Sequence, residues 1–274
     1  MDYSQILSQQ FNIKEEYAKN IITLLDDGNT IPFIARYRKE MHGSMDDQLI
    51  REFAEKLEYL RGLDKRRDEI RSLIDAQEKL TDEINLALDK AATLSELEDI
   101  YRPYRPKRKT RASIAKEKGL EPLANDILKQ EKGFDPSKSA ADYIDEEKGV
   151  TSVEDAIQGA MDIIAELVSD NAEIRKRIRN LTNANGVLVS VATDEEKDSV
   201  YKNYYDYKEP VKKIAGHRVL AVNRGEKEGF LKVSVETDSE KPLNSIFRAM
   251  ITDKNQLCSD IIREACTDAY LSLN

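Results

Sequence analysis

The residues of this sequence best suited to chemistry are the cations and tyrosines of one stretch, YRPYRPKRKTRA, residues 101–112. Between Arg102 and Lys118 there are eight Lys or Arg and one acid, although the whole chain has 43 Lys and Arg against 52 Asp and Glu. Arginine binds phosphate, and tyrosine rings stack on bases. The loop is therefore a candidate nucleic-acid contact.

Two prolines in this loop predict its conformation. Pro103 and Pro106 disfavour the helical region for the residue before each of them, so we expect a polyproline II segment with three residues per turn. Tyrosines would then line one edge and arginines another. The candidate binding residues are Tyr101, Arg102, Tyr104, Arg105, Lys107, Arg108, Lys109 and Arg111. In the alternative interpretation the tyrosines anchor the loop to a long helix, and the arginines pair with acids of the preceding segment SELEDI.

A second basic candidate is IPFIARYRKE, residues 31–40. Helical spacing predicts that its apolar residues, Tyr37 among them, pack inward while Arg36, Arg38 and Lys39 stay outside. With the preceding helix and a short turn, this segment is a candidate helix-turn-helix-like element that binds nucleic acid. A connecting helix whose arginines tie down adjacent chain ends is the alternative. The later tyrosines 201, 204, 205 and 207 are more typical of a packing corner than of a base-stacking platform.

Residues of known catalytic motifs are sparse. The two histidines, His42 and His217, lie in different segments, and no HExxH, GxSxG or Walker sequence is present. Cys258 and Cys266 are eight residues apart without a CxxC, so we expect buried free thiols rather than a zinc site. The sequence thus predicts no catalytic residue, no metal site and no cofactor.

The elements that must position these residues are mostly helices. Charged residues make up 35% of the 274, and apolar residues at 40% recur at helical spacing to about residue 185. Residues 48–80 predict one long helix, or two with a bend near Gly62, and Ser44 is expected to begin it as part of a capping box. After residue 185, GVLVSVAT and GFLKVSVET predict two strands, with a helix between them that Gly225 stops.

These patterns predict a mainly α protein: a long-helix scaffold with a helix-turn-helix-like N-terminal lobe and a small two-stranded β element near residues 187–236. We expect a helical region over residues 1–185, whose first 60 or so residues form the lobe, and a mixed α/β segment over residues 186–274. No apolar run approaches the roughly 20 residues of a membrane span. The N-terminus also lacks the features of a signal peptide, so we expect a cytoplasmic protein.

Three blocks carry a resemblance to a known family. TIPFIARYRKEMHGSMDD, LSELEDIYRPYRPKRKTRASIAKEKGLEPLA and YYDYKEPVKKIAGHRVLAVNRGEKEGFLKV occur in this order and resemble blocks of the Tex family of bacterial transcription accessory proteins. The resemblance implies a helical N-terminal region, followed by RNase H-like, helix-hairpin-helix and OB-fold RNA-binding domains. The last helix stops without a tail, so we expect a piece of a longer protein that ends before those domains.

The resemblance and the basic sites together favour one function. We expect the N-terminal part of a transcription accessory factor that binds RNA or DNA weakly, without sequence specificity, through its basic loops. The alternative is an architectural module that docks RNA polymerase or the missing domains, with the loop serving only structure. The net charge of −9 favours this second hypothesis, because it opposes non-specific coating of nucleic acid.

Overall fold

The structure is a computed structural model, and it describes residues 2–43, 45–106, 109–252 and 254–273. The chain divides into two compact units, Met1–Tyr104 and Arg105–Asn274. The expectation of a mainly α fold is confirmed. The first unit contains α1 (Tyr3–Phe11), α2 (Glu15–Asp26), α3 (Ile31–Tyr37), α4 (Lys39–His42), α5 (Asp47–Asp75), α6 (Asp82–Lys90), α7 (Leu94–Tyr101) and the 3₁₀ turn η1 (Arg102–Tyr104).

Helix α5 is the scaffold of the first unit. It runs unbroken through Gly62 and ends at Asp75, so the single-helix alternative is confirmed, with an end five residues earlier than expected. The predicted capping residue Ser44 lies outside the described residues. The side chain of Asp46 accepts a hydrogen bond from the backbone N–H of Leu49 at 2.8 Å, which satisfies a donor of the first turn.

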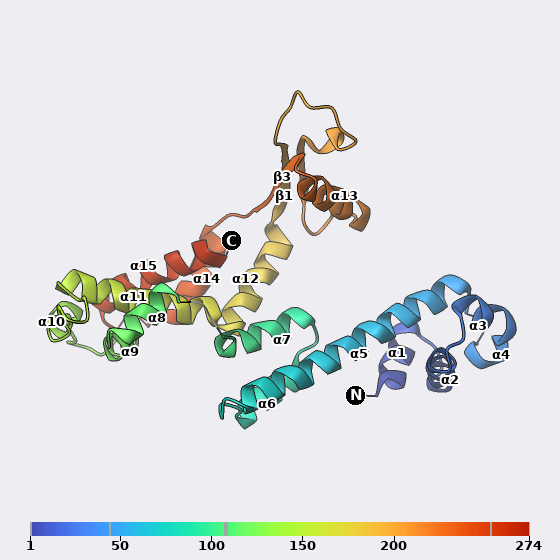
Figure 1. Ribbon diagram of the computed structural model, residues 1–274, viewed down its shortest axis with the longest axis horizontal. Coiled ribbons are helices and arrows are strands. Elements are labelled where there is room, and N and C mark those ends of the chain that lie inside the picture. Colours follow the sequence, from blue (N-terminus) through green and yellow to red (C-terminus); the bar gives the residue numbers. More distant parts are fainter. Residues whose placement is uncertain (1, 44, 107–108, 253, 274) are drawn as a thin grey trace. The chain divides into compact units, whose positions relative to one another are not determined.

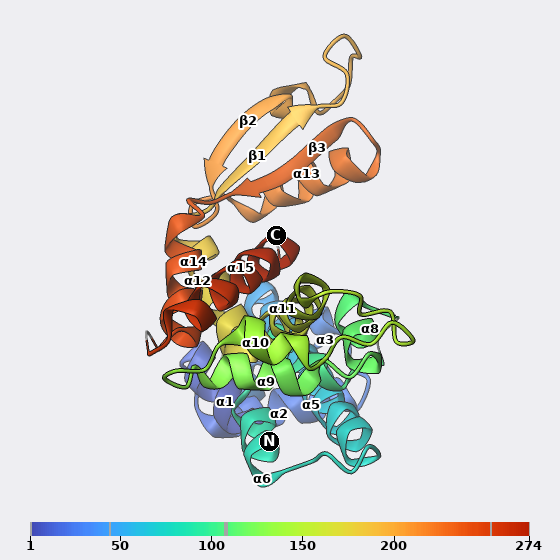
Figure 2. The same ribbon diagram turned by 90° about the vertical axis from the view of Figure 1, so that its left-hand side faces the viewer.

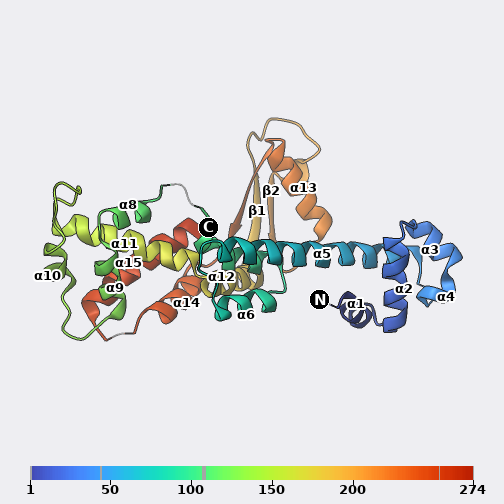
Figure 3. The same cartoon turned by 60° about the horizontal axis from the view of Figure 1, so that its bottom comes forward.

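Two apolar clusters line α5. Its first half packs Ile50 and Phe53 against α1, α2 and α3, and its second half packs Ile70 and Ile74 against α6 and α7. Figure 3 shows α1–α4 gathered at one end of α5 and α6 near the other. The helix thus supports α3 at its start and, near its end, α7 and η1, where the basic loop begins.

In the second unit most helices pack against α11 (Val153–Asp170), as Figure 1 shows. Small residues let its neighbours approach closely: a Cβ on Gly159 would come within 2.3 Å of Leu120. The core also includes the two free cysteines, both buried as expected. The other helices here are α8 (Arg111–Glu117), α9 (Glu121–Lys129), α10 (Pro136–Ala141), α12 (Ala172–Asn185), α14 (Glu240–Met250) and α15 (Gln256–Leu273).

A three-stranded antiparallel sheet follows α12, where two strands were predicted. The strands β1 (Val187–Ala192) and β3 (Leu231–Glu236) are confirmed, and β2 (Asp206–Pro210) pairs with β1 on the other side. The sequence DYKEP hides this strand because it is a short, polar edge in which only alternate residues are half-buried. Figure 2 shows α13 (Gly216–Lys227) along one face of the sheet.

The expectation that Gly225 ends α13 is wrong, because this glycine lies inside the helix. A Cβ there would meet Leu231 at 2.6 Å and Tyr201 at 3.1 Å, so this glycine allows α13 to approach β3. The helix ends at Lys227, before Gly229 with φ of +78°. The tyrosines nearby pack as a corner: the ring centroids of Tyr201 and Phe230 are 5.8 Å apart, and Tyr201 is 6% exposed.

Candidate nucleic-acid interface

The predicted polyproline II rod is wrong at its start. Helix α7 continues to Tyr101, and the next three residues form η1. Arg102 has φ of −51° and ψ of −44°, helical values in spite of the following proline. The physical reason is packing, because the helical path keeps Tyr101 at 6% exposure against the core of the first unit. Its buried ring is not open to stack on a base.

The two tyrosines of the loop fasten it to α5. The guanidinium carbon of Arg66 lies 5.6 Å from the ring centroid of Tyr101. Tyr104 packs against the same cluster, and its carbonyl accepts a hydrogen bond from Gln77 at 3.0 Å. Arg66 also donates to Glu98 at 2.6 Å, a contact that raises the pKa of Arg66. These contacts agree with the anchoring interpretation of the tyrosines.

The cations of the loop fall into different environments. Arg105 is exposed and, among the described residues, has no ion-pair partner. Lys109 pairs with Glu117 at 3.1 Å on the surface. Arg102 is exposed and has a partner within the chain. Lys107 and Arg108 lie outside the described residues, so the predicted arginine edge is tested at neither of them.

Arg111 is tied into the second unit. Its guanidinium donates to Asp268 of α15 at 2.6 Å and lies 3.5 Å from Asp162 of α11, and these carboxylates raise its pKa. Next to it, Thr110 begins α8 through a capping box and donates to Glu166 at 3.0 Å. The end of the basic loop thus joins three helices of the second unit.

The α3–α4 segment is more open than the sequence predicts. Tyr37 was expected to pack inward but is 66% exposed, because α3 has only seven residues and buries only Ile34. Its ring centroid lies 5.4 Å from that of Phe33, over which Arg38 stacks at 5.6 Å. Arg36, Arg38 and Lys39 are exposed, and none of the three forms an ion pair with a described residue.

Buried polar contacts hold this segment in place. The Nε2 atom of His42 hydrogen-bonds the carbonyl of Ile34 at 3.1 Å and the ring is fully buried, so α4 folds back on α3. Asn20 of α2 donates to the carbonyl of Met41 at 3.1 Å. Gly43 follows with φ of +65°, and a Cβ there would lie 2.7 Å from Tyr17. The exposed cations therefore stand on a fixed backbone.

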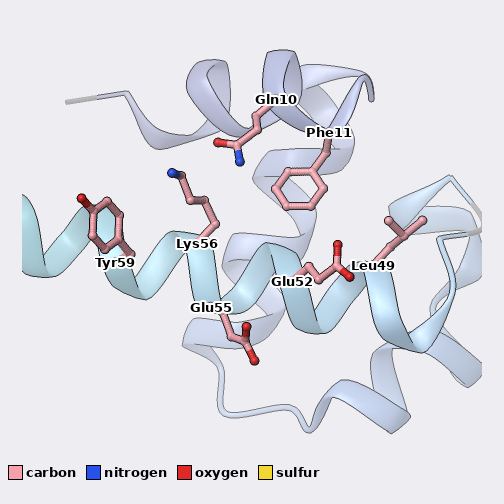
Figure 4. Close-up of a pocket in the computed structure, with 7 residues that line it drawn as sticks. All are labelled: Gln10, Phe11, Leu49, Glu52, Glu55, Lys56 and Tyr59. Carbon is pink, nitrogen blue, oxygen red and sulfur yellow. The ribbon is translucent and has the colours of Figure 1, made fainter. Parts of the chain in front are cut away.

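A groove between α1 and α5 was not anticipated from the sequence. It has a volume of about 600 Å³, and its lining includes Phe11, Leu49 and Tyr59 with the acids Glu52 and Glu55. Figure 4 shows Phe11 and Gln10 above the α5 side chains. Leu49 and Tyr59 are each 41% exposed. The signal in the sequence is that these large apolar residues lie off the buried stripe of α5.

The run RKRIR in α12 is a second feature that the sequence reasoning missed. It places Arg175, Arg177 and Arg179 within two helical turns, and two of them line a groove beside β3.

Over the described ranges, no group of three or more His, Cys, Asp or Glu could hold a metal ion. In the same ranges no helix is long and apolar enough to cross a membrane.

Comparisons with known proteins agree on one family. Residues 131–271 match the family model for the Tex central region-like domain, and residues 1–75 match that for the Tex-like protein N-terminal domain. The transcriptional accessory protein Tex of Neisseria gonorrhoeae is 39% identical over 86% of this chain and 31% of its own length.

Two further relatives extend this comparison. The Bacillus subtilis protein YdcI is 42% identical over all of this chain and 39% of its own length. The human S1 RNA-binding domain-containing protein 1 is 31% identical over 85% of this chain and 24% of its own length. The chain thus spans between a quarter and two fifths of these relatives. With both family models matched in order, this chain belongs to the Tex family.

Proposed function

We propose that this chain is the N-terminal part of a transcription accessory protein and binds RNA or DNA weakly, without sequence specificity, through exposed basic residues. The observation that carries the proposal is the α3–α4 segment, where the exposed Tyr37 is a neighbour in sequence of the exposed Arg36, Arg38 and Lys39. Relatives named for transcription and for RNA binding support it.

The chemistry of this segment suits a single strand. Stacking of a base on an aromatic ring contributes about 1–3 kcal/mol, and any base provides the flat face that stacking requires. Three neighbouring cations that form no ion pair with a described residue can neutralise phosphates. The chain as a whole has a net charge of −9, which repels nucleic acid and keeps the affinity low. Binding is therefore weak, tolerant of sequence and sensitive to salt.

The loop after α7 contributes less than its charge density suggests. Arg105 faces solvent, but the tyrosines pack on α5 and Arg111 binds two carboxylates. Arg105, together with Lys107, Arg108 and Lys109, remains a predicted phosphate contact. In this view the loop adds electrostatic attraction while the exposed Tyr37 supplies stacking.

Fluorescence anisotropy with a labelled single-stranded RNA tests this proposal. Changing Arg36, Arg38 and Lys39 together to Gln should lower the slope of log K against log salt by about 2, since each phosphate contact on a single strand contributes about 0.7. Tyr37→Leu should weaken binding at all salt concentrations. Tyr59→Leu is the matched control, because Tyr59 is also exposed but lies on α5. Equal affinities for the wild type, the triple variant and Tyr37→Leu would refute the proposal.

The loop is tested separately. Changing Arg102, Arg105, Arg108 and Lys109 to Ala should lower the slope on duplex DNA by about 3.6 if each neutralises one phosphate. Unchanged affinity together with a lower melting temperature would instead assign these four residues to structure.

A second candidate function rests on the groove between α1 and α5. Apolar side chains there lie beside Glu52 and Glu55, which suits the basic, amphipathic surface of a protein partner in the transcription machinery. Leu49→Asp should then abolish recovery of purified RNA polymerase on the immobilised chain and leave RNA affinity unchanged. If the wild-type chain recovers no polymerase, this second function is rejected for that partner.

Both candidates are binding functions, and we propose that this chain has no catalytic activity. We also propose that it acts in the cytoplasm.

A further inference from the structure

A second groove lies in the sheet-bearing unit, between α12 and the outer edge of β3. It has a volume of about 480 Å³. Helix α12 leads into β1 through Gly186, and Figure 1 shows the helix continuing into the sheet. Both walls belong to the same unit, so the groove is a feature of that unit alone.

One wall of this groove is basic. Arg175 and Arg179 both line it, and a separation of four residues places them about 6 Å apart along one helix face. Helix α12 has four Lys or Arg against the single acid Glu173. In a chain of net charge −9, such a concentration of positive charge is a local exception. Two arginines at this spacing suit neighbouring phosphates of one extended strand.

The rest of the lining differs from these two arginines, and Glu226 is the one acid among the described residues there. Ile178 and Val235 contribute apolar surface, and Val235 is 47% exposed. Thr182 of α12 and Ser234 of β3 contribute hydroxyl groups, which both donate and accept hydrogen bonds. The apolar surface can contact sugars and bases, and the rotatable hydroxyls can hydrogen-bond the edge of any base. The groove thus offers phosphate contacts on the α12 side, and the carboxylate of its lining, Glu226, accepts a hydrogen bond from the backbone N–H of Val233.

The edge of β3 argues against a peptide as the occupant. A peptide would join the sheet through backbone groups of this edge strand. The backbone N–H of Val233 already donates to the carboxylate of Glu226 on α13 at 3.3 Å. An added strand would have to displace that carboxylate from the backbone N–H of Val233. A nucleic-acid strand, held by its phosphates on the α12 wall, needs no backbone group of β3.

We propose that the groove between α12 and β3 binds the phosphate backbone of single-stranded nucleic acid, Arg175 and Arg179 each contacting a phosphate. The inference rests on the proposed function and adds to it a binding site in the second unit, separate from the α3–α4 segment. Both sites on one chain would raise the apparent affinity of a long strand over that of a short one.

The test uses the whole chain and a fluorescein-labelled oligouridylate of about 15 nucleotides, measured by anisotropy at about 50 mM salt. Each phosphate contact on a single strand contributes about eightfold in affinity at that salt, relative to about 1 M, from a slope of 0.7. Arg179→Gln should therefore weaken binding about eightfold and lower the salt slope by about 0.7. The double variant Arg175→Gln/Arg179→Gln should weaken it about 60-fold.

Arg177→Gln is the matched control, since it removes the same charge from the same helix but Arg177 does not line the groove. Arg175 also donates to the carbonyl of Ser169 at 3.2 Å, so its loss could disturb α12. Arg179→Gln is for this reason the decisive variant, with unfolding in urea as the check of folding. Val235→Glu adds a negative charge to the exposed part of the lining and should weaken binding without removing an arginine.

Distinct outcomes separate this inference from the proposed function. If the wild type binds and Arg177→Gln weakens binding as much as Arg179→Gln, only net charge matters and the groove is rejected. If the wild type binds but neither Arg179→Gln nor Val235→Glu changes the affinity, the groove is rejected while the proposed function stands. If polyglutamate displaces the RNA from the wild type but not from the double variant, the groove binds acidic chains and the inference is wrong. No binding by the wild type rejects both.

Discussion

Arg67 of α5 provides the sharpest test of how the first unit is held together. Its side chain is buried, with 5% of the residue exposed. The guanidinium donates to the carbonyl of Leu88 at 2.9 Å and to that of Ala91 at 3.0 Å, and it pairs with Asp64. Asp64 in turn accepts a hydrogen bond from Tyr3 at 2.8 Å. One arginine therefore fastens the end of α6 to the scaffold that also supports α7.

Replacing Arg67 with Met removes these bonds and keeps most of the side-chain volume. Breaking a buried ion pair by removing one partner costs about 3–5 kcal/mol, and each buried carbonyl left without a donor adds to that cost. The side chain of Asp64 is 18% exposed, so water recovers part of the loss. We expect a decrease of about 3 kcal/mol in the free energy of unfolding of this unit.

The assay is urea unfolding followed by far-ultraviolet circular dichroism, since the chain has no tryptophan to report by fluorescence. Arg71→Met is the matched control. Arg71 lies one turn further along α5 and reaches Asp89 of α6 at 2.7 Å, but it is 31% exposed, so its loss should cost about 1 kcal/mol or less. If Arg67→Met lowers the free energy no more than Arg71→Met does, burial does not decide the strength of these bonds and the reasoning is refuted.

Two further predictions concern the second unit. Gly225→Ala should lower the free energy of unfolding by about 1–3 kcal/mol, because the new Cβ would meet Leu231 at 2.6 Å. The control is Gly62→Ala on α5, whose new Cβ meets nothing within 4 Å and should stabilise the chain slightly. Equal effects of the two changes in urea unfolding would contradict this reasoning. Burial raises the pKa of Cys266 to about 12, so at pH 8 its thiol should react with a disulfide reagent far more slowly in the folded chain than in urea. Rapid reaction of both cysteines in the folded chain would refute the burial.

Sequence patterns predicted those helices and strands in which buried apolar residues recur at regular spacing. The apolar residues of α5 recur at helical spacing over several turns, and β1 and β3 are rich in valine, so each pattern has one interpretation. The strand β2 has no such pattern because DYKEP is polar and only alternate residues are half-buried. Its pairing with β1 is a tertiary contact that the local sequence does not contain.

The candidate sites were harder, because local rules compete with packing there. Pro103 disfavours a helical Arg102, yet burial of Tyr101 outweighs that preference. Tyr37 has helical spacing to apolar neighbours, yet a helix of seven residues is too short to turn its whole apolar set toward the core. Tyr101 is buried and Tyr37 is exposed, and in both places the exposure of the tyrosine depends on tertiary packing that the local sequence does not contain.

Charge density alone does not identify a binding surface in an acidic chain. With 52 acids for 43 Lys and Arg, a cation binds phosphate more readily where fewer carboxylates compete for it. Arg111 lies between Asp162 and Asp268, so a phosphate would have to compete with two carboxylates already in place. Arg38 instead stacks on Phe33, a contact that fixes the guanidinium without neutralising its charge. Because that charge remains available, the shorter basic segment has the stronger case for binding nucleic acid.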